Sequence, residues 1–348
     1  MPYLAIKLHI YMKKNVKIIF IILISALLLA AITSALYFGR KQKSIKKTEV
    51  PGKLILGFSQ IGSESAWRTR NTQSIFEAAE QNDIQIIYDD AQQKQANQLK
   101  AIRSFIVYQV DVIAFVPIVS DGWDNVLQEA KAAGIPVIVV DREINCDESL
   151  YAGFLGEDGF EEGFAAANYL VKKCKNRSGP INIVEFSGTE NSSIATQRAE
   201  GFRSVINKFD KFQIIHSQDG DFLRSRGKEM MDKIIAESGN LSINGKKIDV
   251  IYSHNDSMTL GLLDSLHNNS INTRNIIIIS IDAEQKSIDA LVNGELNCVV
   301  ECNPNSGPTL MSLVKTIAAG EKIPRRTYML DNIFTEEDDF STYTPRGY

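Results

Sequence analysis

The sequence has few cysteines and histidines, and neither type is arranged as a metal or redox site. Its four cysteines are Cys146, Cys174, Cys298 and Cys302, no Cys-x-x-Cys pair occurs, and the four histidines are scattered. Zinc and dithiol sites need such residues at characteristic spacings, so we expect no metal and no cofactor. Cys298 and Cys302 lie on one expected strand and would be about 13 Å apart, too far to form a disulfide with each other. Other pairings stay open.

Sequence motifs of common enzymes are also lacking. No Gly-x-Ser-x-Gly, His-Glu-x-x-His or phosphate-binding loop occurs. The acidic pairs Glu157-Asp158 and Glu161-Glu162 resemble the two carboxylates of a glycosidase. They lie at an expected helix start, however, where acidic side chains are stabilised by the helix dipole. We therefore expect a protein that is not an enzyme.

Positive charge is scarce outside the N-terminal region. Residues 1–50 hold nine of the 38 Lys and Arg but only one of the 42 acidic residues, Glu49. The remaining chain has 29 basic and 41 acidic residues, a formal charge of −12. Because binding to a phosphate backbone depends on clustered cations, this charge argues against a nucleic-acid partner.

One long apolar run stands near the N-terminus. Ile18–Phe38 has 21 residues without charge, proline or glycine, about the length that spans a bilayer and longer than a signal-peptide core. We expect a transmembrane anchor or a signal segment at 18–38, with cleavage allowed near Ser34 and no cysteine for a lipid anchor. Residues 1–17 are then a cytoplasmic leader. Alternatively, translation starts at Met12 and residues 1–11 are an upstream extension of the reading frame. Residues 39–52 form a linker. Both alternatives place the rest of the chain outside the cytoplasm.

From residue 53 onward, short apolar runs alternate with segments of helical periodicity. The expected strands are 53–60, 84–88, 112–116, 136–140, 181–186, 212–217, 249–253 and 276–281. The expected helices are 67–81, 92–109, 123–133, 160–173, 197–208, 223–237, 257–268 and 308–320. Such alternation is typical of parallel sheets covered by helices on both faces, and about 300 residues suffice for two cores. We therefore predict an α/β fold with two doubly wound parallel-sheet lobes.

Polar or aromatic residues follow most of the strands at their carboxyl ends. Ligands of doubly wound sheets bind at these ends. The function is therefore expected at these positions, in a cleft between the lobes. The residues concerned are Ser59, Gln60, Asp89, Asp141, Arg142, His254, Asn255, Asp256 and Asp282.

Several segments closely resemble the type I periplasmic sugar-binding proteins of bacterial ABC importers, nearest to the galactofuranose-binding members. They are GFSQIGSESAWR (57–68), DDAQQKQANQLKAIRSF (89–105), the stretch 110–142 ending in PVIVVDR, QDGDFLRSRGKEMM (218–231) and SHNDSMTLG (253–261). The resemblance implies two lobes joined by a three-segment hinge, with a sugar enclosed between them. It places lobe 1 at 53–155 plus 303–330 and lobe 2 at 156–302 plus 331–348.

The resemblance also implies which side chains bind the sugar. Asp141 and Arg142 would bracket neighbouring hydroxyls, and Trp67 would cover an apolar face of the ring. The other expected ligand-binding residues are Glu64, Ser65, Arg68, Arg198, Phe222, Asn255 and Asp282, with Asp89, Gln92 and Glu301 as second-line contacts. At the last position either Glu301 or Cys302 could face the ligand. We further expect Asp256 to cap the following helix, and note that Ala283 stands where many relatives have glycine, which tolerates a positive φ.

The expected function is an extracytoplasmic receptor that closes around a monosaccharide and delivers it to an ABC permease. A galactofuranose-like furanose is favoured, while ribose, arabinose and galactose stay open. The alternative is a sugar sensor that signals to a membrane histidine kinase. Closure follows because the ligand contacts both lobes only in the closed form. We expect a monomer, and a transcription regulator of related fold is disfavoured because the membrane segment occupies the place of a DNA-binding region.

Overall fold

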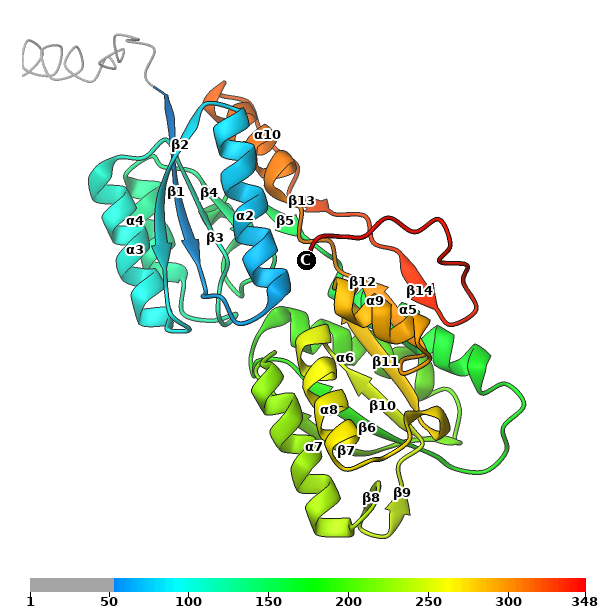
Figure 1. Ribbon diagram of the computed structural model, residues 1–348. Coiled ribbons are helices and arrows are strands. Elements are labelled where there is room, and N and C mark those ends of the chain that lie inside the picture. The colour runs from blue at the N-terminus through cyan, green and yellow to red at the C-terminus, as the bar shows by residue number, and fades with distance from the viewer. Residues whose placement is uncertain (1–52) are drawn as a thin grey trace, which may run out of the picture. The chain divides into compact units, whose positions relative to one another are not determined.

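The structure is a computed structural model that describes residues 53–348. The expected anchor or signal segment at 18–38, its leader and its linker lie outside the described residues. Within the described part, no helix combines the length and the apolar composition needed to cross a bilayer. The described residues form two α/β lobes, each built on one six-stranded sheet (Figure 1).

The first lobe contains a parallel sheet in the order β2-β1-β3-β4-β5-β13. Its strands are β1 (Leu54–Gln60), β2 (Ile84–Asp90), β3 (Val112–Phe115), β4 (Val137–Val140), β5 (Gly153–Gly156) and β13 (Arg326–Tyr328). Its helices are α2 (Ala66–Gln81), α3 (Gln95–Tyr108), α4 (Asp124–Ala132) and α10 (Gly307–Ala318). Buried side chains of α2 and α10 pack on one face of the sheet, and those of α3 and α4 pack on the other.

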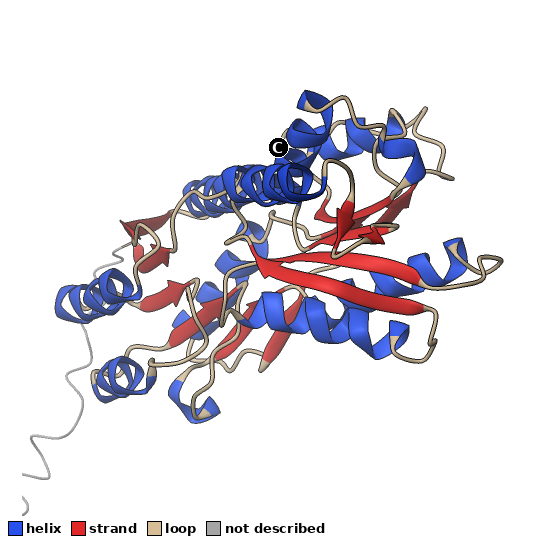
Figure 2. Cartoon of the chain, turned by 90° about the horizontal axis from the view of Figure 1, so that it is seen from below, coloured by secondary structure: helices blue, strands red, loops and turns tan. Residues whose placement is uncertain are grey.

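The second lobe repeats this topology with the order β7-β6-β10-β11-β12-β14, in which β14 alone is antiparallel. Its strands are β6 (Ile181–Ser187), β7 (Phe212–Asp219), β10 (Val250–Ser253), β11 (Ile277–Asp282), β12 (Cys298–Glu301) and β14 (Ile333–Thr335). Its helices are α5 (Gly159–Lys173), α6 (Ser193–Ile206), α7 (Arg224–Ser238), α8 (Asp256–Asn268) and α9 (Gln285–Val292). Helices α5 and α6 cover one face, and α7, α8 and α9 cover the other. Figure 2 shows the strands flanked by helices.

The chain passes between the two sheets at three places. It leaves the first sheet after β5, returns to the first lobe between β12 and α10, and crosses again between β13 and β14. In both sheets the first strand is flanked by the second and the third, so each sheet has a switch point where loops diverge and a ligand can bind. The predicted class, two α/β lobes with parallel sheets, is confirmed.

Several elements differ from the prediction. Helix α6 begins at Ser193 rather than Gln197, because Ser192 has extended backbone angles and serves as its N-cap. Strand β5, helix α9 and strands β13 and β14 were not predicted. Each of them has eight residues or fewer, and β13 and β14 are largely solvent-accessible, so no continuous apolar run marks them. Also unpredicted are a short hairpin, β8 (Ser242–Ile243) with β9 (Lys246–Lys247), and the 3-10 turns Glu148–Leu150 and Thr273–Asn275.

Candidate functional site

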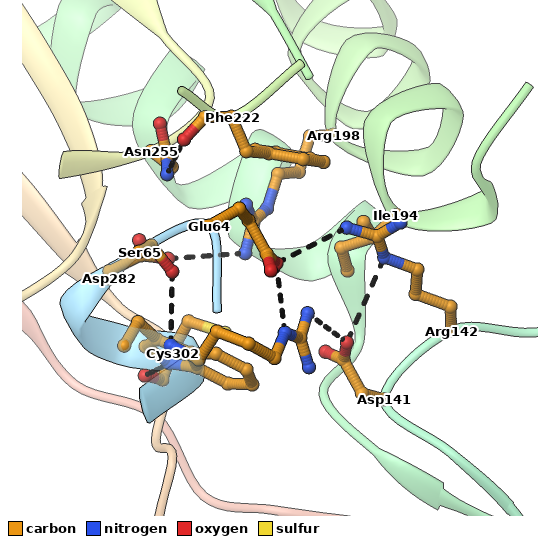
Figure 3. Close-up of a pocket in the computed structure, with 12 residues that line it drawn as sticks. Glu64, Ser65, Asp141, Arg142, Ile194, Arg198, Phe222, Asn255, Asp282 and Cys302 are labelled. Atoms are coloured by element: carbon orange, nitrogen blue, oxygen red, sulfur yellow. Dashed lines mark hydrogen bonds and ion pairs between the residues drawn. The ribbon is translucent and has the colours of Figure 1, made fainter. Parts of the chain in front are cut away.

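A small cavity lies between the lobes, where loops following strands of both sheets converge. The cavity has a volume of about 20 Å³. All ten predicted ligand-binding residues line this cavity, together with Ile194 and Cys302 (Figure 3). The first lobe supplies Glu64, Ser65, Trp67, Arg68, Asp141 and Arg142, and the second lobe supplies Ile194, Arg198, Phe222, Asn255 and Asp282.

The loop after β1 presents the first group of residues through the start of α2. Ser65 is the N-cap of this helix, and its hydroxyl accepts a hydrogen bond from the Arg68 backbone N–H at 3.0 Å. This cap fixes the first turn, which carries Trp67 and Arg68. Both side chains are buried, and the Arg68 guanidinium carbon lies 4.6 Å from the centroid of the Trp67 ring.

Asp141 occupies a strained turn at the end of β4. Its φ is 64°, and the Arg142 N–H donates to the carbonyl of Val140 across it at 2.7 Å. A three-residue turn with a left-handed central residue is rare and costs free energy, and such strain gathers at functional sites. The turn directs the two neighbouring side chains, Asp141 and Arg142, into the cavity.

Four charged groups of lobe 1 form a buried network. Arg68 donates from Nε to Glu64 at 2.9 Å and from Nη2 to Asp141 at 2.7 Å. Arg142 donates to the Ile118 carbonyl at 3.2 Å and lies at salt-bridge distance from Asp141 and Glu64, at 3.8 and 4.0 Å.

Burial, and then the nearby Arg68 cation, lower the pKa of Arg142 to about 10. Burial opposes the charge of Arg68 too, but Asp141 and Glu64 outweigh it and raise the Arg68 pKa. Both guanidiniums are therefore charged at neutral pH.

Arg198 of helix α6 is the cationic side chain that lobe 2 contributes to the cavity. It donates to both carboxylate oxygens of Glu162 on α5, at 2.7 and 3.2 Å, and also to the carbonyl of His254. Asp282, at the end of β11, lies 3.8 Å from the same guanidinium. Burial raises the pKa of Asp282 well above its ordinary value, although Arg198 counteracts this. Helices α5 and α6 can approach closely here because residue 163 is glycine: a Cβ at that position would lie 2.1 Å from the Arg198 carbonyl oxygen.

The upper part of the cavity in Figure 3 is formed by Phe222 and Asn255. Phe222 is 5% exposed and has a left-handed φ of 59°. Asn255 is the N-cap of α8, where its Oδ1 accepts from Met258 N–H at 3.0 Å, while its Nδ2 donates to the Phe222 carbonyl at 3.2 Å. The prediction that Asp256 caps this helix is wrong. Its carboxylate instead accepts from Ser280 and from the Glu284 N–H, since it faces the interior beside β11.

At the end of β11 two consecutive residues have positive φ, with 124° at Asp282 and 62° at Ala283. Ala283 therefore adopts the conformation for which glycine would be preferred, at a cost of roughly 1–2 kcal/mol. The turn aims the Asp282 side chain into the cavity. The strained residues Asp141, Phe222 and Asp282 thus surround one space.

Hydrogen bonds hold the lobes together around the cavity. The Trp67 N–H donates to Glu284 at 3.1 Å, the Ser120 N–H to the Asn191 carbonyl at 3.0 Å, and the Glu143 N–H to Ser193 Oγ at 2.6 Å. The Trp67 side chain also packs within the buried apolar cluster of lobe 2. The structure is therefore a closed form of the two lobes.

The three predicted second-line residues lie outside the cavity lining. Asp89 lies on β2, Gln92 is exposed after the same strand, and Glu301 is paired with Arg346 and Asn332. Their neighbours are closer to the site: Gln93 donates to Glu64 at 3.1 Å, and Cys302 lines the cavity. Ile194 and Glu284 were not considered. Ile194 gave no signal beyond apolarity, whereas Glu284 follows the Asp282 strand end and could have been found by the same rule that found Asp282.

The chemistry available in the cavity is hydrogen bonding rather than catalysis. Two guanidinium nitrogens, Nη1 of Arg68 and Nε of Arg142, are buried and have no hydrogen-bond partner among the described residues. Burial keeps the thiol of Cys302 protonated by raising its pKa well above the ordinary value. No group of three or more His, Cys, Asp or Glu within 53–348 is arranged to hold a metal ion. The cavity therefore offers buried donors and acceptors on two lobes to a small polar ligand.

Comparison with known proteins agrees with this geometry. Residues 56–322 match the family model described as a periplasmic binding protein domain. The chain belongs to this family. The galactofuranose-binding protein YtfQ of Escherichia coli (strain K12) is 41% identical over 265 residues, which cover 75% of this chain and 81% of that protein. Members of this family, including the galactofuranose-binding relative, are solute-binding proteins and not enzymes. The prediction that this protein is not an enzyme is therefore confirmed.

Solved structures of the family show the same arrangement. A structure from Mycobacterium smegmatis in complex with beta-D-fucofuranose has a TM-score of 0.77 and 42% identity, covering 81% of this chain and 91% of that one. The periplasmic binding protein of the arabinose ABC transporter from Shewanella sp. ANA-3, bound to alpha- and beta-L-arabinofuranose, has a TM-score of 0.76 and 36% identity, covering 81% and 92%. The predicted resemblance to this family is confirmed.

Proposed function

We propose that the chain is an extracytoplasmic receptor that binds one furanose-form monosaccharide between its two lobes. The observation on which this rests most directly is a pair of buried guanidinium donors, Arg68 Nη1 and Arg142 Nε. They belong to side chains that line the cavity and have no hydrogen-bond partner within residues 53–348. An unsatisfied buried donor costs about 1–3 kcal/mol, and a ligand hydroxyl would remove this cost. Three relatives whose names or structures refer to furanoses support the ring form.

Each side chain has a role in this proposal. Asp141 and Arg142 bracket neighbouring hydroxyls from lobe 1, and Arg198, Asn255 and Asp282 bind from lobe 2, while Trp67 and Phe222 cover apolar faces of the ring. The three arginines are balanced in charge by Glu64 and Asp141 in lobe 1 and by Glu162, which pairs with Arg198 in lobe 2, while burial favours the protonated form of Asp282 by raising its pKa. Such a site favours a neutral ligand, because an added buried charge would lack a counter-ion.

Closure of the two lobes is the structural change through which a partner protein detects the bound sugar. Lobe 1 (53–155 with 303–330) and lobe 2 (156–302 with 331–348) would rotate about the three crossing segments, and the ligand would shift the population to the closed form because only that form provides both sets of contacts. The protein acts as a monomer that presents both lobes to a membrane partner. That partner is an ABC permease, to which the sugar is delivered. The arabinose ABC transporter component among the relatives supports this assignment.

Residues 18–38 would place the receptor at the outer face of the membrane, as an anchor or as a cleaved signal. An apolar run of 21 residues is long enough to span the hydrocarbon core of a bilayer. The polar linker 39–52 would then separate the lobes from the membrane surface.

The test is a ligand screen on the full chain in mild detergent, using D-galactose, D-fucose, L-arabinose and D-ribose. A true ligand at 100 times its dissociation constant is expected to stabilise the fold by about 2.7 kcal/mol. Carbon-13 NMR of the bound, C1-labelled sugar then identifies its ring form. Arg142→Lys is expected to lose the stabilisation, whereas Arg103→Lys, which changes a surface pair with Glu129, should keep it. A ligand bound as a pyranose, or a thermal shift that persists in Arg142→Lys, would count against the proposal.

A further inference from the structure

Trp67 is held in place by two hydrogen bonds that leave its own lobe. Its backbone N–H donates to Glu284 Oε1 at 3.1 Å, and its indole N–H donates to the Cys302 carbonyl at 2.6 Å. Glu284 belongs to lobe 2 and precedes α9, and Cys302 follows β12 on a crossing segment. The position of Trp67 in the closed form therefore depends on where these two acceptors lie.

One segment, Arg346–Tyr348, contacts the neighbours of both acceptors. Next to Glu284, Gln285 donates its N–H to the Tyr348 carbonyl at 2.6 Å and accepts the Arg346 N–H at 2.8 Å. Next to Cys302, the Glu301 carboxylate accepts a hydrogen bond from the Arg346 guanidinium. Arg346 also donates to the Tyr348 hydroxyl at 2.8 Å, so the segment is a closed set of contacts that joins the two acceptor sites.

The Tyr348 ring completes this arrangement. It packs against the buried cluster that contains both Trp67 and Cys302. The Arg346 guanidinium carbon lies 5.0 Å from the centroid of the Phe334 ring, and its side chain is 14% exposed. Burial lowers the pKa of Arg346, but its interactions with Glu301 and Tyr348 outweigh burial and raise the pKa overall. A charged, hydrogen-bonded and partly buried arginine holds a more exact position than a surface pair would.

We propose that Arg346–Tyr348 is a positioning segment for Trp67 and thereby sets the affinity of the closed site. The inference rests on the proposed sugar-binding function and adds to it residues that do not touch the ligand. Trp67 lies in lobe 1 while both acceptors are outside it, so the segment acts on the contact that forms at closure. Loss of the segment's polar contacts lets Glu284 and Cys302 shift, and the indole then loses the orientation that the ligand requires.

The experiment uses Tyr348→Phe and Arg346→Gln in the full chain, with Tyr108→Phe and Arg274→Gln as matched controls at exposed positions. Arg346→Gln removes the bond to Glu301, and Tyr348→Phe removes only the hydroxyl that accepts from Arg346. The measurements are the dissociation constant and dissociation rate of the sugar found in the screen above. We expect Arg346→Gln to raise the dissociation constant about tenfold, the size of effect that residues orienting a contact residue commonly have. Most of this change should be a faster dissociation rate, as for most variants of one binding site. Tyr348→Phe is expected to have a smaller effect of the same sign.

A spectroscopic readout separates positioning from general stability. The chain has two tryptophans, Trp67 and Trp123, so a Trp123→Phe background reports Trp67 alone. In the ligand-bound state, Arg346→Gln is expected to red-shift the Trp67 emission and increase its quenching by acrylamide, whereas the controls leave both unchanged. Unchanged affinity and emission in Arg346→Gln, with ligand binding intact in the parent, would overturn the positioning role. No sugar binding by the parent chain would instead refute the proposed function.

Discussion

Arg142 of lobe 1 lies over the ring of Phe222 of lobe 2, with 5.2 Å between the guanidinium carbon and the ring centroid. Arg198 lies over the same ring at 5.9 Å. The first of these contacts joins the two lobes directly, so it exists only while the lobes are closed. A desolvated cation–π contact is worth about 2 kcal/mol, enough to affect the closed population.

Replacing Phe222 by leucine is therefore expected to weaken sugar binding more than it weakens the fold. Leucine keeps much of the apolar burial but lacks the ring face that attracts both guanidiniums. We expect the dissociation constant to rise roughly 30-fold, equivalent to about 2 kcal/mol, as measured by isothermal titration calorimetry. Phe160→Leu, at a half-exposed position, serves as the control. Equal affinities of the two variants would show that Phe222 acts only as packing.

The turn at Asp141 predicts different stabilities for two substitutions. Asparagine tolerates the left-handed φ of 64° and keeps one acceptor for Arg68, whereas alanine has no acceptor and is strained. Both variants should lose the sugar-induced thermal shift. In the absence of ligand, however, Asp141→Ala is expected to be less stable than Asp141→Asn by about 1–2 kcal/mol. Denaturant titration measures this difference, and equal stabilities would contradict the role of backbone strain.

The position of Arg198 depends on the close approach of helices α5 and α6 at Gly163. A methyl group there would overlap backbone atoms of α6, 2.1 Å from the Arg198 carbonyl oxygen. Gly163→Ala is expected to destabilise the protein by about 1–3 kcal/mol, the usual cost of overpacking, and to weaken sugar binding because the Glu162–Arg198 pair shifts. Asn168→Ala on the exposed side of α5 provides the control. If thermal unfolding showed Gly163→Ala to be as stable as the parent, the helices would have room to separate.

The sequence predicted which residues lie around the cavity better than it predicted the contacts that hold them in place. Polar residues at the ends of buried strands identified Asp141 and Asp282, because strand ends at a sheet edge converge whatever the loops do. The choice between Asn255 and Asp256 as the helix cap failed, since both are good caps and only tertiary packing buries Asp256 against β11. The roles of Cys302 and Arg346 could not be predicted, because they depend on contacts between segments far apart in the chain.

The balanced charges of the cavity predict discrimination against charged sugars. A uronate or an amino sugar would add a buried charge to a site whose arginines and carboxylates already neutralise one another. Burying an uncompensated charge costs several kcal/mol, so the charged analogue of the best neutral ligand should bind at least about 100-fold more weakly. Competition titration against the neutral sugar measures this ratio. Comparable affinity for a uronate would mean that one of the carboxylates paired with an arginine, Glu64, Asp141 or Glu162, is protonated in the complex.

Asp331, on the third crossing segment, predicts a pH dependence of stability. Burial, and then the Glu162 carboxylate, raise its pKa from 3.8 to about 8, although the Asn303 N–H that it accepts at 3.1 Å opposes this. Between these values the folded protein holds a proton that the unfolded chain has lost. The stability from neutral Asp331 is thus complete below pH 3.8 and is lost as the pH rises through 8, with a slope of at most about 1.4 kcal/mol per pH unit.

Asp331→Asn imitates the protonated side chain and should remove this dependence. The difference in unfolding free energy between Asp331→Asn and the parent is expected to grow in favour of the variant as the pH rises from 5 to 8. Burial lowers the pKa of His254, which gives an opposite trend below about pH 6.5, but that contribution is shared by both proteins and cancels in the difference. Asp210→Asn, at an exposed position of lobe 2, should show a constant difference. A constant difference for Asp331→Asn as well would mean that this carboxylate is ionised in the folded protein.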